Sequence, residues 1–146
     1  MNIVCVDLFC GIGGLTHGLI ESGINVRVGF DIDESCAYAY KTNNRNTKFF
    51  GEDVASVPGE RIKEWFYGAE FSMLAGCAPC QPFSTNTIKA SARIRHKTWP
   101  LLREFGRLIV ETLPDVVTME NVPRLAQHQI FSEFVNTLNA KWVGDI

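Results

Sequence analysis

The sequence predicts an α/β fold built on a doubly wound, mostly parallel sheet, and three observations lead to this expectation. Short apolar runs alternate with segments of helical spacing along the whole chain. The first run is followed by Gly11-Ile12-Gly13-Gly14, a glycine-rich turn of the kind that joins a strand to a helix. No repeat, linker or low-complexity tract interrupts the alternation. Strands that alternate with helices form a parallel sheet with right-handed crossovers.

Five apolar runs are predicted to be strands because they are short and rich in β-branched or aromatic residues. In chain order they are residues 3–8, 26–30, 47–50, 71–75 and 115–119. Five helices are expected between and after them, at residues 15–22, 34–42, 60–66, 99–112 and 130–138. Gly23 ends the first helix, Asn43-Asn44 the second and Pro114 the fourth. The fourth has the clearest helical period, carried by Leu101, Leu102, Phe105, Leu108 and Ile109.

Length and composition limit the class of protein. A chain of 146 residues is expected to be one domain, and a hydrophobic share of 46% excludes wholesale disorder. No apolar run approaches the roughly 20 residues of a membrane helix and no signal peptide opens the chain, so we expect a cytoplasmic protein without a membrane partner. Five cysteines, an odd number, favour reduced thiols over a disulfide framework.

The glycine-rich turn and the acids after the next two strands predict a nucleoside site. Such a turn lets the backbone approach a ligand closely and offers N–H groups to an anion. The dinucleotide fingerprint requires a third glycine where this chain has Thr16, so a pyrophosphate site is the weaker interpretation. Asp31 is placed to accept hydrogen bonds from ribose hydroxyls, and Asp53 can face an adenine amino group, with Ile32 and Val54 as apolar walls. This pattern suits S-adenosylmethionine; a purely structural turn is the alternative.

The most informative stretch is Gly76-Cys77-Ala78-Pro79-Cys80-Gln81-Pro82-Phe83-Ser84, which follows the fourth strand. A tight Pro/Cys turn can hold a thiolate at the rim of a sheet, so Cys80 is a candidate nucleophile. Cys77 and Cys80 also form a C-x-x-C pair. A zinc site is disfavoured because no further ligands are clustered in the sequence. A redox pair is disfavoured because it requires a helix right after the second cysteine, whereas Pro82 and a long polar loop follow Cys80. We expect a structural role for Cys77 and inert, buried thiols at Cys5 and Cys36.

Glu120 ends the apolar run of the fifth strand. An acid there is expected to be desolvated, which raises its pKa and lets it donate a proton near neutral pH. A capping or salt-bridged acid is the alternative. Asn121 is expected to hold either this carboxyl or an edge of the substrate.

Positive charge is concentrated after the candidate nucleophile. Residues 81–107 contain six Lys or Arg residues against one acid, although the net charge of the chain is −2. Such a segment is expected to contact nucleic-acid phosphates, with a solvated loop and helix face as the alternative. The candidate phosphate contacts are Lys89, Arg93, Arg95 and Lys97.

Together these motifs resemble the DNA (cytosine-5) methyltransferase family. The run from Asp7 to Gly14 resembles its cofactor loop, the run from Ala78 to Ser84 its catalytic loop, and Glu120-Asn121-Val122 its acid motif. The run Trp99-Pro100-Leu101-Leu102-Arg103-Glu104-Phe105 resembles the helix between the last two, and the resemblance extends from Ile3 to about Leu138.

The resemblance implies a Rossmann-like, S-adenosylmethionine-dependent methyltransferase fold and a set of site residues, without a metal. The implied catalytic residues are Cys80, Gln81, Ser84, Glu120 and Asn121. The implied cofactor-binding residues are Asp7, Phe9, Cys10, Gly11, Ile12, Gly13, Gly14, Asp31, Ile32, Asp53, Val54 and Pro79. In the family, Phe9 and the residue at Ile32 pack against the adenine, and the latter is commonly a bulky aromatic.

The implied substrate is a cytosine flipped out of double-stranded DNA. The Cys80 thiolate would add to C6, Glu120 would protonate or hydrogen-bond N3, and C5 would accept the methyl group before a base removes its proton and Cys80 leaves. Residues 81–97 would close over the base.

Several later motifs of the family are not found: two further strands, a Gln-x-Arg-x-Arg motif, a target-recognition region and a closing helix. We therefore expect residues 1–146 to be the N-terminal part of a catalytic domain, incomplete at the C-terminus. It would need a complementary methyltransferase subunit or C-terminal half, would leave residues 116–118 as an open strand edge, and would be weakly active or inactive alone. An RNA cytosine-5 methyltransferase and a non-catalytic cofactor-binding or partner-binding module remain alternatives.

Overall fold

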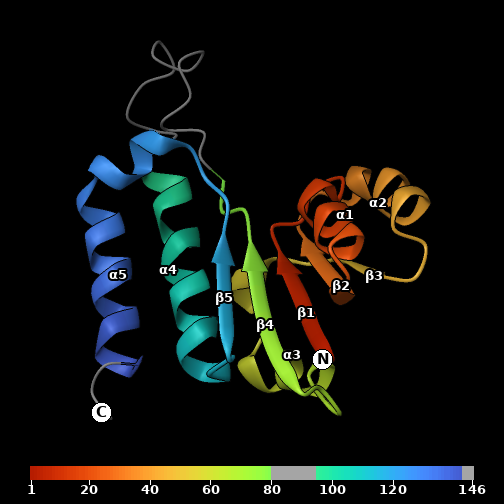
Figure 1. Ribbon diagram of the computed structural model, residues 1–146. Coiled ribbons are helices and arrows are strands. Elements are labelled where there is room, and N and C mark those ends of the chain that lie inside the picture. The colour runs from red at the N-terminus through yellow and green to blue at the C-terminus, as the bar shows by residue number, and fades with distance from the viewer. Residues whose placement is uncertain (80–94, 143–146) are drawn as a thin grey trace.

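The computed structural model describes residues 1–79 and 95–142, and for residues 95–100, 141 and 142 it describes the backbone only. Within these ranges five strands form one parallel sheet in the order β3-β2-β1-β4-β5 (Figure 1). The strands are β1 (Ile3–Leu8), β2 (Asn25–Asp31), β3 (Lys48–Gly51), β4 (Phe71–Gly76) and β5 (Val116–Met119). The predicted α/β fold with a parallel sheet is confirmed.

Helices connect consecutive strands, as the alternation in the sequence predicts. The α-helices are α1 (Gly14–Glu21), α2 (Ala37–Asn43), α3 (Gly59–Trp65), α4 (Arg95–Thr112) and α5 (Gln129–Trp142). The 3₁₀ helices within the described residues are η1 (Glu34–Cys36), η2 (Val54–Ser56) and η5 (Pro123–Gln127). The helix expected over residues 34–42 is divided into η1 and α2. Asp33 caps the N-terminus of η1 by accepting a hydrogen bond from the Ser35 N–H at 3.0 Å, and the first turn is a tighter 3₁₀ turn.

The helix α4 begins at Arg95, four residues before the expected start at residue 99. The expectation rested on the apolar spacing from Leu101 to Ile109, which gives no signal for the polar turn before residue 99. As a consequence the backbone of Arg95 and Lys97 is helical, whereas the sequence analysis placed both residues in a loop that closes over the substrate.

The carboxyl ends of β1, β2, β4 and β5 lie side by side, at the same end of the sheet. Leu8 lies opposite Phe30 and Gly76, and Gly76 lies opposite Met119. Backbone hydrogen bonds continue the pairing beyond the strands, from the Cys10 N–H to the Phe30 carbonyl at 3.1 Å and from the Cys77 N–H to the Leu8 carbonyl at 3.2 Å. The loops that follow β1, β2, β4 and β5 therefore leave the sheet side by side.

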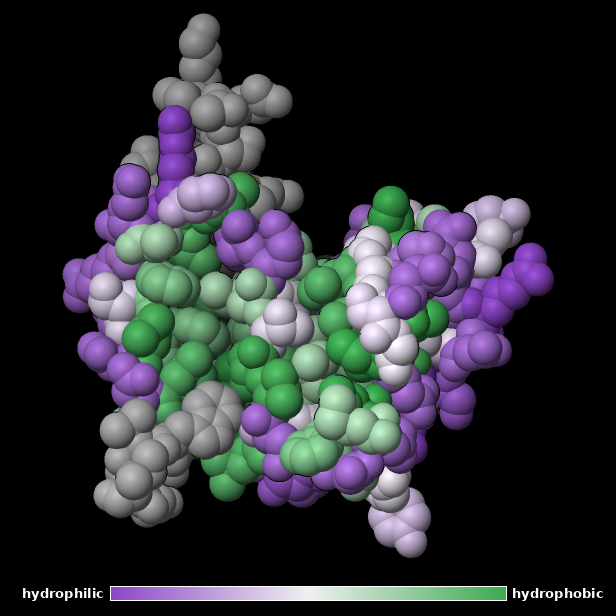
Figure 2. All heavy atoms as spheres, viewed as in Figure 1, coloured by the Kyte–Doolittle hydropathy of each residue, from purple (hydrophilic) through white to green (hydrophobic). Residues whose placement is uncertain are grey.

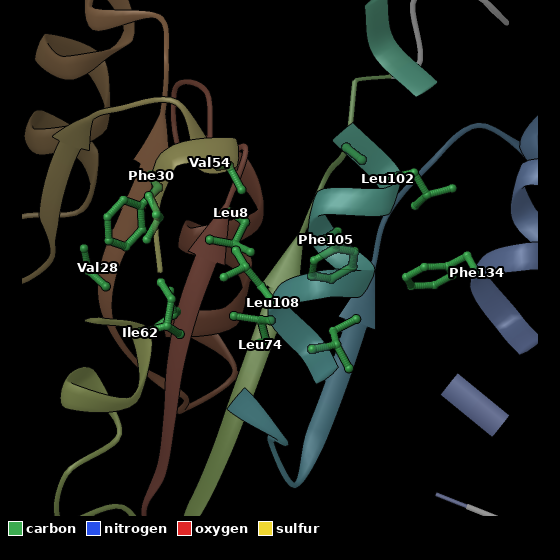
Figure 3. Packing of buried hydrophobic residues seen from close by; sticks show 14 of the residues in the cluster. Leu8, Val28, Phe30, Val54, Ile62, Leu74, Leu102, Phe105, Leu108 and Phe134 are labelled. Atoms are coloured by element: carbon green, nitrogen blue, oxygen red, sulfur yellow. The ribbon is translucent and has the colours of Figure 1, made fainter. Parts of the chain in front are cut away.

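Two apolar clusters cover the two faces of the sheet. The larger lies between the sheet and α3, α4 and α5, with Leu8, Leu74, Ile62 and Phe105 buried at its centre (Figure 3). The smaller lies on the opposite face under α1 and contains Cys5, Val26, Met73 and Ala75. This division follows from the strand period, since successive side chains of β1 and β4 point to opposite faces.

The strand β5 lies at the edge of the sheet, and within the described residues its paired neighbour is β4. A hollow of about 430 Å³ lies between β5 and α5. Figure 2 shows hydrophobic side chains gathered on this face of the molecule, over β5 and toward α5. The apolar side chains that line the hollow are Val117, Met119, Phe131, Phe134, Val135 and Leu138.

In the part of the chain that the structure describes, no helix has both the length and the apolar character needed to cross a bilayer. Cys5, Cys10 and Cys36 form no disulfide bond there. Cys5 is buried as expected, whereas Cys36 is only half-buried, because it lies in the exposed turn η1.

Candidate cofactor and catalytic site

The glycine-rich turn leaves β1 with an unusual backbone. Phe9, Gly11 and Gly13 have positive φ angles of 56°, 51° and 87°, in the left-handed region that favours glycine. A Cβ on Gly13 would lie 2.3 Å from Nδ2 of Asn44, so this position is closed to other residues. A Cβ on Gly11 would meet no atom within 4 Å. The turn is thus packed on the side of Gly13 and open at Gly11.

The helix α1 begins directly after this turn. Its N-cap is Gly13, and no side chain caps its first N–H groups. Uncapped N–H groups at a helix N-terminus attract polar and anionic ligand atoms. Ile12, whose side chain is 61% exposed, lies on the open side of the same turn.

Asp31 joins the end of β2 to the turn. Its Oδ2 accepts a hydrogen bond from the Gly11 N–H at 2.8 Å, and its Oδ1 accepts one from the Asp33 N–H at 2.9 Å. A carboxylate has about four acceptor positions, so two remain for hydroxyl groups of a ligand. Ile32, next along the chain, is 69% exposed and offers an apolar surface beside this carboxylate. The structure therefore brings Gly11, Asp31 and Ile32 together as the sequence predicts.

Asp7 and Cys10 lie beneath the turn instead of lining its open side. The Asp7 side chain is fully buried, and its Oδ2 accepts a hydrogen bond from Thr16 Oγ1 at 2.6 Å. Burial raises the pKa of Asp7 to about 6, and the hydrogen bonds from Thr16 partly offset this rise. Burial also raises the pKa of the Cys10 thiol. The side chains of these two residues are closed off from the surface, so only the Cys10 backbone borders the open side of the turn.

Asp53 and Val54 follow β3 at the same edge of the sheet, where Gly51 pairs with Asp31. Asp53 is exposed, and its Oδ1 accepts a hydrogen bond from the Ala55 N–H at 3.0 Å, which caps η2. Val54 is 2% exposed and packs into the larger core cluster. The expected apolar wall at Val54 is therefore not formed, because the turn η2 points this side chain inward.

The acid motif after β5 is bound to the loop after β4. The Glu120 N–H donates to the Gly76 carbonyl at 3.1 Å, and the Cys77 thiol donates to Glu120 Oε2 at 3.1 Å. Asn121 Nδ2 donates to the Ala78 carbonyl at 2.8 Å, while its Oδ1 accepts from the Val122 N–H at 2.9 Å. Asn121 therefore joins the two loops, and its hydrogen bonds within the described residues go to Ala78 and Val122 and not to the Glu120 carboxyl.

The Glu120 carboxyl is exposed, contrary to the expected desolvation. The physical reason is its position: Glu120 follows Met119, the last residue of β5, and β5 is the outermost strand of the sheet. Pro79, half-buried, is the last described residue of the loop after β4. Cys80, Gln81, Ser84, Lys89 and Arg93 lie outside the described residues, as do the side chains of Arg95 and Lys97.

The model of the C-5 cytosine-specific DNA methylase family matches residues 3–141. The chain belongs to this family.

Two relatives and one solved structure illustrate the similarity of this methylase chain to others. It is 44% identical over 136 residues to the Type II methylase M.HgiDII of Herpetosiphon aurantiacus, covering 91% of the chain and 37% of that protein. It is 32% identical over 120 residues to the Type II methyltransferase M.AluI of Cellulosimicrobium cellulans, covering 82% and 22%. The structure of a protein described as a DNA modification methyltransferase of an E. coli prophage matches with a TM-score of 0.75 and 28% identity, over 99% of this chain and 38% of that one. The methylase chain thus spans less than half of the length of these proteins.

The geometry fits S-adenosylmethionine, the donor that methyltransferases generally use. The open cradle at Gly11, the uncapped N–H groups of α1 and the spare acceptor positions of Asp31 suit its amino-acid and ribose portions. The exposed side chain of Ile32 and the exposed carboxyl of Asp53 suit an adenine. Within the described residues, no group of three or more His, Cys, Asp or Glu side chains is arranged to hold a metal ion.

The positively charged segment after β4 partly forms contacts inside the fold. Arg107 donates to Glu104 at 2.6 Å, to Glu111 at 2.9 Å and to the Val57 carbonyl at 3.1 Å. Arg103 pairs with Glu133 at 3.1 Å. Both arginines belong to the basic segment of residues 81–107. Their acidic partners Glu111 and Glu133 lie outside this segment, so the local sequence does not reveal the pairs. Arg107, whose side chain is 31% exposed, stabilises the packing of α4 through these contacts, whereas Arg103 is 67% exposed and stays at the surface.

Sequence reasoning also missed three buried polar residues beneath the turn, Thr16, Tyr40 and Asn44. The one available signal was Thr16, which stands where the dinucleotide fingerprint has its third glycine. Nothing local in the sequence marks Tyr40 or Asn44, since both contact the turn from α2.

Proposed function

We propose that this chain provides the cofactor-binding and catalytic part of an enzyme that methylates C5 of cytosine in double-stranded DNA, with S-adenosylmethionine as the donor. The observation that carries the proposal is the hydrogen bond of 2.8 Å from Asn121 to the Ala78 carbonyl. It joins the acid motif to the loop that contains Cys80, at the same edge of the sheet as the turn held by Asp31.

The residues that would hold the cofactor are those on the open side of the turn. Gly11, Ile12 and Gly14 would border its amino-acid portion, Asp31 its ribose, and Ile32 with Asp53 its adenine. Phe9 and Pro79, both half-buried, would flank the same pocket. When bound, S-adenosylmethionine supplies an electrophilic methyl group.

Cys80 is the proposed nucleophile. Its thiolate forms a bond to C6 of the cytosine, which makes C5 nucleophilic. Glu120 stabilises the developing negative charge by donating a hydrogen bond or proton to N3 of the ring. After C5 has accepted the methyl group, a base removes the C5 proton, the electron pair reforms the C5–C6 double bond and the sulfur leaves as thiolate. Gln81 and Ser84 are proposed to orient the base within the same loop.

Cytosine within a duplex cannot reach these groups, so the target base must be flipped out of the helix. Lys89, Arg93, Arg95 and Lys97 are proposed to contact the phosphates on either side of it. These contacts are independent of sequence, so the choice of target site requires further elements.

We propose that those elements belong to a complementary portion that docks on β5, as a second subunit or as a further part of the same polypeptide. The chain covers 37% of M.HgiDII, so its relative has the length for such a portion. The edge position of β5 and the apolar hollow beside α5 support the site of docking, because an added strand would satisfy the outer backbone groups of β5 and cover Val117, Met119 and Phe131.

A trapping experiment tests the catalytic proposal. The chain is incubated with S-adenosylmethionine and duplex DNA containing 5-fluorocytosine, alone and with the portion of M.HgiDII beyond the matched region. Fluorine at C5 prevents release of the sulfur, so a covalent protein–DNA adduct is expected with the complemented sample. The adduct should disappear in Cys80→Ser and persist in Cys36→Ser, its matched control.

Three outcomes would contradict the proposal. An adduct that persists in Cys80→Ser would exclude Cys80 as the nucleophile. Methyl transfer to tRNA but not to duplex DNA would favour an RNA cytosine-5 methyltransferase. Cofactor binding without any adduct, even after complementation, would favour a non-catalytic module.

A further inference from the structure

A cluster of buried polar side chains lies beneath the glycine-rich turn, on the side opposite the proposed cofactor. Its members come from three elements that are distant in sequence: β1, α1 and the segment from α2 to its C-cap. They are Asp7 and Thr16 at 0% exposure, Tyr40 at 0% and Asn44 at 2%. Most buried polar groups in proteins are hydrogen-bonded, because their removal from water costs free energy. In this cluster Asp7 Oδ1 and Asn44 Oδ1 have no hydrogen-bond partner among the described residues. This cost indicates that the cluster has a role beyond filling the core.

The donor and acceptor of each hydroxyl contact in the cluster can be assigned. Thr16 has a single hydroxyl proton and gives it to Asp7 Oδ2 at 2.6 Å. The contact of 3.1 Å between Thr16 Oγ1 and the Tyr40 hydroxyl therefore has Tyr40 as its donor. When Asp7 is ionised, the order is Tyr40 to Thr16 to Asp7, and the chain of bonds ties α2 to α1 and α1 to β1.

The same tyrosine also presses against the backbone of the turn. A Cβ on Gly13 would lie 2.7 Å from Cδ2 of Tyr40, and a Cβ on Gly29 would lie 2.5 Å from its hydroxyl. Two glycines thus make room for one side chain. Asn44 completes the contact, because its Nδ2 donates to the Gly13 carbonyl at 3.3 Å and to the Tyr40 carbonyl at 3.2 Å.

We propose that Thr16 and Tyr40 are positioning residues for the cofactor, acting through the turn they support. The hydroxyl chain and the Tyr40 ring hold Gly13 in its left-handed conformation, which in turn aims the Gly11 N–H at Asp31 and the first N–H groups of α1 at the ligand. This rests on the proposed function of the turn as the S-adenosylmethionine site. It also accounts for threonine where a dinucleotide-binding turn has a third glycine: the side chain is required as the link between Tyr40 and Asp7.

The test removes one hydroxyl at a time. Tyr40→Phe and Thr16→Val each delete a link, Thr16→Ser restores the hydroxyl without the methyl group, and Tyr38→Phe is the matched control on α2, since Tyr38 is 84% exposed. Two quantities are measured on each complemented protein: the dissociation constant of S-adenosylhomocysteine by calorimetry, and the hydrogen–deuterium exchange of residues 10–15 without ligand.

Tyr40→Phe and Thr16→Val are expected to weaken binding by about five- to thirtyfold and to accelerate exchange in the turn, as the loss of a buried hydrogen bond predicts. Thr16→Ser and Tyr38→Phe should match the wild type in both measurements. Unchanged affinity in Tyr40→Phe, which removes a single oxygen atom and keeps the ring, would overturn the inference. So would weaker binding with unchanged exchange, since the hydroxyls would then act elsewhere than on the turn.

The proposed function and this inference fail separately. If the wild type does not bind S-adenosylhomocysteine, the assignment of the cofactor is wrong, and the positioning role falls with it; the exchange data then report whether the hydroxyl chain supports the turn at all. If the wild type binds and the variants bind equally well, only the positioning role is wrong.

Discussion

Asn121 Nδ2 lies 2.8 Å from the carbonyl oxygen of Ala78, two residues before Cys80 in the chain. This hydrogen bond links the loops that follow β4 and β5, and Asn121 Oδ1 is used by the Val122 N–H, so both ends of the amide are held. The acid motif therefore acts as a support for the loop that carries the proposed nucleophile.

Replacing Asn121 is expected to slow covalent trapping more than it destabilises the chain. Asn121→Ala removes the link to Ala78 and should lower the rate of adduct formation on 5-fluorocytosine DNA about 10- to 100-fold, because small displacements of a nucleophile carry large kinetic costs. The free energy of unfolding should fall by about 1 kcal/mol, as for one hydrogen bond. Asn46→Ala, at an exposed position, is the control, and an unchanged trapping rate would show that the link has no catalytic role.

The thiol of Cys77 is expected to orient the Glu120 carboxyl group. Cys77→Ala removes the donor at 3.1 Å and should lower the single-turnover rate of methyl transfer about 3- to 10-fold, as the loss of one hydrogen bond predicts. Cys77→Ser keeps a donor and should retain most of the rate. If the alanine and serine variants are equally slow, the effect comes from packing and not from the hydrogen bond.

Asp7 is expected to make stability depend on pH. Its pKa is about 6 in the folded chain against 3.8 for the free group, so between these values the folded state binds more protons than the unfolded state. The contribution of Asp7 to the free energy of unfolding should therefore fall by about 3 kcal/mol as pH rises from about 4 to about 6, and stay level above that range. Urea unfolding of the wild type and of Asp7→Asn over this pH range measures this contribution. The stability advantage of the wild type over Asp7→Asn should narrow or reverse toward neutral pH. A difference in free energy of unfolding that does not change with pH would contradict the raised pKa of Asp7.

Arg107 is expected to contribute more to the stability of the chain than Arg103. Arg107 is half-buried between two acids, whereas Arg103 is exposed. Arg107→Ala leaves Glu104 and Glu111 without their shared partner and should lower the free energy of unfolding by about 1–3 kcal/mol. Arg103, 67% exposed in its pair with Glu133, should change stability by less than about 0.5 kcal/mol when replaced by alanine. Thermal and urea unfolding test both, and equal effects would mean that the core contacts of Arg107 carry no additional stability.

The local pattern of the chain determined the architecture and the approximate place of the site. Each predicted strand is observed within about two residues, because β-branched runs and glycine or proline breaks act over short distances. Parallel strands end at a common edge, so placing Asp31 and Glu120 at strand ends was sufficient to bring their loops to one side of the sheet.

Only the tertiary structure decided which of these side chains face outward and which have partners. Asp7, Cys10 and Val54 lie inside, Glu120 lies outside, and Arg107 is drawn into the fold by acids and carbonyls from other segments. The roles of Thr16 and Tyr40 depend on a contact between residues 24 positions apart. Burial and hydrogen bonding are set by packing between such distant segments, and periodicity along the chain carries no record of that packing.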